Sequence, residues 1–209
     1  MPRIVSSILV AMSFVLPSAY AAGSTALPSP EELPANTVAV VSEVPLDLGR
    51  ITQAELQRAL VEVAAAAGRD SVPGPGDNGY RGLKDEAFGQ RLDFIWIEGQ
   101  AAMMGIDVSP RRVARELALI KNQSFESGAE YQRYLKEAHF TQRDVRERVR
   151  VQLLTTRIQN RVERRGGGGL AGFKAFKQFV DAYAERWRAR TVCTPEYVTD
   201  RCSNGPPPG

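Results

Sequence analysis

The sequence contains a single histidine, His139, and only two cysteines, which leaves few residues for the commonest catalytic and metal sites. A Ser–His–Asp or Cys–His site would have to use His139, and no partner stands at a recognisable spacing from it. Neither a His-Glu-x-x-His sequence nor a Cys/His zinc spacing occurs. Residues 167–172 match the glycine pattern of dinucleotide-binding loops, but they follow an expected helix rather than a strand. We therefore expect no catalytic residue, no metal and no cofactor.

The sequence also lacks long apolar runs, and its one short run lies at the N-terminus. Arg3 supplies positive charge, residues 4–16 form the apolar run, and Ala19-Tyr20-Ala21 supplies the small–x–small pattern of a signal-peptidase site. A bilayer span needs about 20 apolar residues, so a cleaved signal is favoured over an uncleaved anchor. We predict a signal peptide over residues 1–21, cleaved after Ala21. The mature protein would then work outside the cytoplasm, in the periplasm, in the cell envelope or as a secreted protein.

Cys193 and Cys202 lie close together near the C-terminus. Outside the cytoplasm two neighbouring cysteines most often pair. We predict a structural disulfide that stabilises the fold by roughly 2.5–3 kcal/mol. A redox-active pair is the alternative, although the spacing is not Cys-x-x-Cys and only Arg201 stands near enough to acidify a thiol.

Helix-capping residues predict that most of the chain is helical. Thr52 with Glu55 and Thr141 with Asp144 have capping-box spacing, and Ser109 precedes a proline at a first helical position. We predict a mainly α fold of about six helices with one short N-terminal strand or hairpin, in which the C-terminal helix packs back on the N-terminal helices. The expected elements are a strand at 37–44 and helices at 52–68, at 85–104, from 109, from 127, at 141–164 and at 170–190.

The helix expected from Thr141 onward is rich in arginine. Arg146, Arg150 and Arg157 are our candidates for contact with an anionic membrane surface or an envelope polymer. A solvated face whose charges pair with acidic residues elsewhere is the alternative explanation. Nucleic acid is not expected as a partner, because the protein is exported and no aromatic residues alternate with these arginines to stack bases.

With these helices placed, the chain resembles the N-terminal chaperone domain of the SurA/PrsA-type exported foldases. The first strand followed by ITQAELQRAL is similar to the family's strand, turn and helix start, and GIDVS resembles its turn between two helices. Residues 129–162 are similar to its short helix, capped turn and long closing helix. Residues 173–202 resemble a C-terminal helix and cysteine loop of actinobacterial members. The resemblance covers nearly all of residues 38–202.

The resemblance also suggests a domain organisation. Prolyl-isomerase members carry a parvulin domain between the long helix and the C-terminal helix, where this chain has only RRGGGGLAG. We therefore expect the parvulin domain to be absent, which puts prolyl isomerisation in doubt. The expected divisions are a signal peptide (1–21), a flexible tether (22–36), the helical chaperone domain (37–165), a glycine linker (166–172), a C-terminal helix with a disulfide loop completing the domain (173–202), and a disordered tail (203–209).

The function that the resemblance implies is ATP-independent binding of unfolded or newly exported polypeptides. An apolar cradle would take up extended segments reversibly, with adaptable methionine and aromatic side chains as contacts. Each candidate has a position in the core as its alternative. The candidates are Phe94, Trp96, Met103, Met104, Tyr131, Tyr134 and Phe140. Two other functions stay open: prolyl isomerisation, the one enzymatic activity that the family suggests, and a structural envelope protein that binds anionic lipid or polymer.

Overall fold

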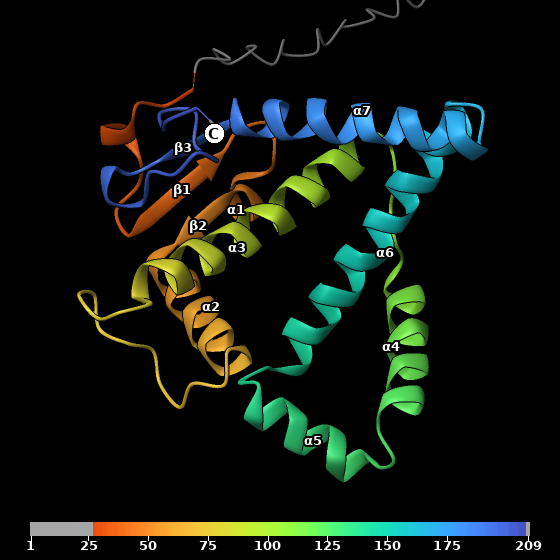
Figure 1. Ribbon diagram of the computed structural model, residues 1–209, viewed down its shortest axis with the longest axis horizontal. Helices are drawn as coiled ribbons and strands as arrows, with labels where there is room; N and C mark the ends of the chain where they lie inside the picture. Colours follow the sequence, from red (N-terminus) through yellow and green to blue (C-terminus); the bar gives the residue numbers. More distant parts are fainter. Residues whose placement is uncertain (1–26, 208–209) are drawn as a thin grey trace, which may run out of the picture.

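The computed structural model of the 209-residue chain describes residues 27–207, so the predicted signal peptide lies outside the described residues. The fold is mainly α, as predicted, with a small sheet at one end (Figure 1). In the described part of the chain, the strands are β1 (Thr37–Val41), β2 (Arg50–Thr52) and β3 (Thr191–Cys193). The helices are α1 (Leu46–Gly49), α2 (Gln53–Ala66), α3 (Tyr80–Met103), α4 (Pro110–Ser124), α5 (Gly128–Glu137), α6 (Gln142–Arg165) and α7 (Gly169–Arg188). Short 3-10 turns lie at Pro30–Glu32 and Pro195–Tyr197.

The sheet joins the two ends of the domain. Its order is β2-β1-β3, and both pairs are antiparallel, with Ala39 opposite Ile51 on one side and opposite Cys193 on the other. Every residue of β1 is buried, because strands flank it and helices cover it. The pairing of β3 with β1 means that the C-terminal segment completes the N-terminal structure. This confirms that the C-terminal helix packs back, while β3 itself was not predicted.

Two helices begin at the predicted capping boxes. The Glu55 amide donates to Thr52 Oγ1 (3.2 Å), and the Thr52 amide donates to the Glu55 carboxylate (2.8 Å). Thr141 and Asp144 make the same pair of bonds at 3.2 and 2.7 Å. Each box satisfies amides that the first helical turn leaves without a partner. These bonds fix where α2 and α6 start and therefore which faces they present to α3.

Two apolar clusters form the core, and α3 belongs to both. The first cluster joins β1, β2, α2 and the N-terminal part of α3 to Trp187 and the two cysteines. The second joins Ala101 of α3 to the α3–α4 turn, to α4 and to α6. A helix with apolar residues on two faces can serve two clusters at once. Helix α3 is therefore the central helix of the domain.

Helix α7 contacts α6 near its start and α3 near its end. Near its start, a Cβ added at Gly172 would lie 2.6 Å from the Glu163 carbonyl oxygen, so α6 and α7 cross in close contact there. Near its end, the Trp187 side chain is fully buried and its indole N–H donates to Gln100 Oε1 (3.2 Å). In Figure 1, α7 runs along the top of the molecule and returns the chain to the sheet. The helix begins at Gly169, inside the segment expected to be a linker at 166–172.

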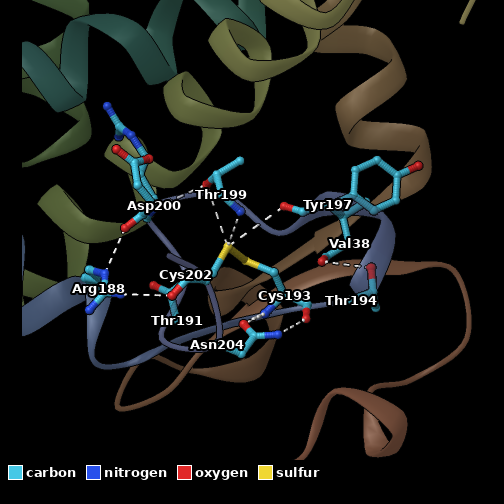
Figure 2. Close-up of a disulfide and its surroundings, with 12 residues drawn as sticks. Val38, Arg188, Thr191, Cys193, Thr194, Tyr197, Thr199, Asp200, Cys202 and Asn204 are labelled. Carbon is cyan, nitrogen blue, oxygen red and sulfur yellow. Dashed lines mark hydrogen bonds between the residues drawn. A yellow bond between two sulfur atoms is a disulfide. The ribbon is translucent and has the colours of Figure 1, made fainter. Parts of the chain in front are cut away.

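The predicted disulfide between Cys193 and Cys202 is present, and neither side chain is exposed (Figure 2). The Asn204 side chain accepts from the Cys193 amide (3.2 Å) and donates to its carbonyl oxygen (2.8 Å). The Ser203 amide donates to the Thr191 carbonyl oxygen (2.7 Å). The ordered loop therefore continues past Cys202 into residues that the sequence assigned to a disordered tail at 203–209.

Candidate functional site

A groove of about 710 Å³ opens where α1, β2, α2, α3, α4 and α6 meet. Its volume is in the range of sites that hold small molecules or a few side chains of a larger ligand. Its lining combines an apolar set with a charged set. The apolar residues are Leu48, Phe94, Ile95, Pro110, Val113 and Ala114. The charged residues are Asp47, Arg50, Glu55, Arg91, Glu98, Arg143, Arg146, Glu147 and Arg150.

The apolar lining comes from three helices, α1, α3 and α4. Ile95 and Val113 are nearly fully buried and belong to the walls formed by α3 and α4. Leu48, on the short helix α1, is 53% exposed although it lines the same groove. An exposed leucine beside buried apolar groups is a surface that gains free energy when a ligand covers it. The groove therefore has apolar surface available for a ligand.

Arg150 holds together the elements that form the groove. Its guanidinium makes a two-pronged ion pair with Glu98 of α3 (2.7 and 3.1 Å) and donates to the Val108 carbonyl oxygen (2.6 Å). Hydrogen bonding to Glu98 raises the pKa of Arg150 above its ordinary value, and the Asp107 carboxylate adds to this effect. Paired arginine–carboxylate bonds of this kind fix orientation as well as distance. Arg150 therefore ties α6 to α3 and to the turn before α4.

A smaller, polar pocket of about 140 Å³ adjoins the groove and shares part of its lining, including Phe94. There the Arg148 guanidinium pairs with the largely buried Glu62 (2.8 Å). Burial raises the pKa of Glu62, and the hydrogen bond from Arg148 partly opposes that rise. Two guanidinium groups, those of Arg91 and Arg148, each lie 5.7 Å from the centre of the Phe94 ring. These contacts hold the aromatic wall of the groove in place.

Of the seven predicted polypeptide contacts, Phe94 is the one that lines the groove. Trp96 and Tyr131 are only 4% and 1% exposed, and the Trp96 indole N–H donates to Thr191 Oγ1 (3.0 Å). A ligand could reach these two side chains only if the core opened. Met103 is exposed at the end of α3, whereas Met104 is half-buried against the second cluster.

The other two predicted contacts lie in an aromatic group around α5. Tyr134 has its ring 5.3 Å from that of Phe125 and 6.1 Å from that of Phe140. Tyr134 is 41% exposed, and Phe140 is half-buried with Arg148 over its ring. Neither residue lines the groove. The structure thus divides the seven candidates among the groove, the core, the end of α3 and α5.

The three arginines predicted to contact an anionic surface are in different environments. Arg146 is exposed and lines the groove. Arg150 also lines the groove but is engaged with Glu98 and Val108, as described above. Arg157 is exposed and donates to the Asp107 carbonyl oxygen. Of the three arginines, only Arg150 pairs with acidic side chains, whereas the partner of Arg157 is a backbone carbonyl oxygen.

Sequence reasoning missed most of the groove lining. Leu48 lies on the short helix α1 between β1 and β2, and Pro110, Val113 and Ala114 belong to the first turns of α4. The apolar spacing of α4 predicts that one face is buried, but nothing in the sequence relates that face to Leu48. Only the tertiary packing, with α4 against α6 and α1 against β1, brings these residues together.

The fold is that of a small, mainly helical domain, and its groove combines apolar and charged side chains. The family described as the SurA-like N-terminal domain matches residues 3–159. The chain therefore belongs to this family, and the match includes every residue that lines the groove. Comparisons with curated proteins and with solved structures gave no match.

Two kinds of feature are absent from residues 27–207: a membrane-spanning helix and a cluster of metal ligands. No helix in this range is both long and apolar enough to span a bilayer. No three His, Cys, Asp or Glu side chains in the same range are grouped so that they could hold a metal ion.

Proposed function

We propose that this protein is an exported chaperone that binds unfolded or newly secreted polypeptides in the groove, without ATP. The observation that carries the proposal is the apolar lining where α1, α3 and α4 meet, with Leu48 left half exposed. Membership of the SurA-like family is consistent with a chaperone-like role and with unfolded polypeptides as ligands. The buried disulfide is consistent with an oxidising compartment, and so with export.

The binding step needs no chemistry. An extended segment places apolar side chains against Leu48, Phe94 and the α4 wall, and the water that covered both surfaces is released. The contact is non-directional, so different sequences can use it, and a segment leaves when its own folding buries the same side chains. The Arg150–Glu98 pair keeps the walls in place while ligands exchange.

A groove variant with a matched control tests the proposal. Leu48 and Leu119 are almost equally exposed, at 53% and 52%, but only Leu48 lines the groove. The wild-type protein should suppress aggregation of a chemically denatured substrate at near-stoichiometric amounts, measured by light scattering without nucleotide. Leu48→Ser should weaken suppression about fivefold, the loss expected for roughly 1 kcal/mol of apolar contact. Leu119→Ser should leave suppression unchanged.

The outcome distinguishes the groove from other apolar surfaces. Helix α7 carries exposed Leu170 and Phe173, and Phe173→Ser is the variant that reports on this face. A loss with Phe173→Ser but not with Leu48→Ser would place binding on α7 and overturn the groove assignment. No suppression by the wild-type protein over a tenfold excess would overturn the chaperone proposal itself.

The two other functions suggested by the sequence give different results with the same protein. Prolyl isomerisation would accelerate a proline-limited refolding reaction above its spontaneous rate. Binding to an anionic surface would appear as salt-sensitive association with anionic vesicles that Arg146→Ala, Arg150→Ala and Arg157→Ala together abolish. Arg150 and Arg157 already have partners within the protein, which favours the chaperone proposal over binding to an anionic surface.

A further inference from the structure

We infer that the groove selects polypeptide segments in which acidic side chains flank apolar ones. This inference rests on the proposed function, because it specifies which segments the same groove would bind. The observation behind it is the balance of charge that remains around the groove after its internal ion pairs are counted.

Three of the four acidic residues of the lining are already engaged. Glu98 is paired with Arg150, and Glu147 with Arg91 (3.3 Å). The Glu55 carboxylate accepts hydrogen bonds from the Thr52 amide and hydroxyl, both at 2.8 Å. Asp47 is the fourth acidic residue, and no ion pair involves it among residues 27–207.

Three arginines of the lining stand against the two carboxylates that form no ion pair among residues 27–207, those of Asp47 and Glu55. Arg50, Arg143 and Arg146 are all exposed, and within the described part of the chain none of them forms an ion pair. Arg143 and Arg146 are three residues apart on α6 and so share a face of that helix. Arg50 belongs to β2, two residues after Leu48. Positive charge thus reaches the groove from two separate elements.

The apolar lining and the exposed arginines have different roles in binding. The apolar lining supplies affinity for any extended apolar segment, whereas exposed charges mainly set the choice of ligand and the rate of encounter. Each exposed ion pair between the groove and a peptide changes the affinity by only about two- to fivefold, because solvent and salt screen it. Up to three such pairs predict roughly a tenfold preference for acidic over basic flanks.

Polypeptide is favoured over an anionic bilayer as the ligand because the arginines surround an apolar groove. A polypeptide can place an apolar and an acidic side chain within two or three residues of each other, and both Leu48 and Arg50 line the groove. A flat surface of headgroups would satisfy the arginines but would leave the apolar lining uncovered. Vesicle binding is therefore one of the outcomes that the experiment must separate.

The experiment uses three labelled peptides that share one apolar core and carry glutamate, glutamine or lysine on both sides. Affinities for the wild-type protein are measured by fluorescence anisotropy at low and at physiological ionic strength. The glutamate peptide should bind about tenfold more tightly than the lysine peptide, and added salt should narrow this difference. The glutamine peptide should bind with intermediate affinity and depend little on salt.

A triple variant tests whether these arginines are responsible. Arg50→Gln/Arg143→Gln/Arg146→Gln should reduce binding of the glutamate peptide to the level of the glutamine peptide and leave the glutamine peptide unaffected. Arg133→Gln/Arg164→Gln/Arg165→Gln makes the same change in net charge at exposed positions outside the groove, and it should keep the wild-type preference. Circular dichroism checks that both variants are folded.

The possible results separate this inference from the proposed function. Equal affinity for all three peptides, or an unchanged preference in the groove variant, would overturn the charge selection while the chaperone proposal stands. Failure of all three peptides to bind would overturn both. Binding of anionic vesicles that depends on Arg50, Arg143 and Arg146, without any peptide binding, would assign the groove to lipid and would also overturn both.

Discussion

Gly99 allows the indole of Trp187 to lie directly on α3. A Cβ added at Gly99 would come within 2.9 Å of Trp187 Cζ3 and of a Val44 methyl group. Trp187 is fully buried and bonded to Gln100, so its ring has little freedom to move aside. The absence of one side chain at position 99 therefore sets how closely the end of α7 approaches α3.

Gly99→Ala should lower the free energy of unfolding by about 1–3 kcal/mol, because a methyl group is forced into a filled space. Gly82→Ala is the matched control, since it lies on the same helix with no atom near its added Cβ. That change should raise stability by about 0.4–1 kcal/mol by restricting the unfolded chain. Urea unfolding of the two variants measures both effects. Similar stability of the two would show that Trp187 does not depend on the glycine.

Phe94 and Trp96 show why single site residues were hard to predict. Both are large aromatic residues on α3, but they are two positions apart and so point to nearly opposite sides of a helix with 3.6 residues per turn. One lines the groove, and the other is buried against Thr191. The apolar residues of α3 repeat along two faces of the helix. Only the packing of α6 and β3 decides which of these two faces remains open.

At the scale of elements, β3 and the loop after it hold the end of α7 against the sheet. The loop is closed by the disulfide and by the bonds of Asn204 to Cys193. Figure 2 shows the Asn204 side chain beside the backbone of Cys193, with its two bonds drawn to the amide and the carbonyl oxygen. Because β3 has only three residues, the crosslink is a large part of what positions it.

Cys193→Ala/Cys202→Ala should lower the free energy of unfolding by about 2.7 kcal/mol, the loop-closure value for a crosslink between residues nine apart in sequence. Urea unfolding with and without reductant measures the difference. Reductant should destabilise the wild-type protein by a similar amount and leave the variant unaffected. Equal stability of oxidised wild type and variant would indicate that the native contacts alone fix β3.

Helix starts could be predicted where a side chain satisfies the first amides locally, as Thr52 and Thr141 do. The start of α3 at Tyr80, rather than near Asp85, was missed because its N-cap is Gly79, which has no side chain to mark the position. The strand β3 was missed for a different reason. Three residues carry little periodic signal, and the strand exists through its pairing with β1, which is far away in the sequence. The groove depends on the same kind of distant contact.

At the scale of the whole molecule, α3 connects the two apolar clusters. Ile95 and Trp96 belong to the first cluster, and Ala101, less than two turns later, belongs to the second. The α6–α7 pair adds a second connection, because α6 carries Leu154 in the second cluster while α7 ends with Trp187 in the first. A ligand in the groove touches α3, α4 and α6 together, so its binding surface exists only while both clusters are folded.

This coupling predicts one cooperative unfolding transition for the described domain. The two tryptophans of the chain, Trp96 and Trp187, are both in the first cluster, so their fluorescence reports on that cluster alone. Circular dichroism reports on all the helices. The two signals should give the same midpoint in urea.

Leu154→Ala tests the coupling, because Leu154 is fully buried in the cluster that contains no tryptophan. The cavity should cost about 2–5 kcal/mol and should shift both midpoints to lower urea by the same amount. Leu119→Ala, at a half-exposed position on α4, is the control that should shift neither appreciably. A two-step dichroism curve with an unchanged fluorescence midpoint would mean that the clusters unfold separately. In that case the groove could open when α4 and α6 unfold while the sheet and α2 stay folded. The stability of the weaker cluster would then determine how readily a ligand is released.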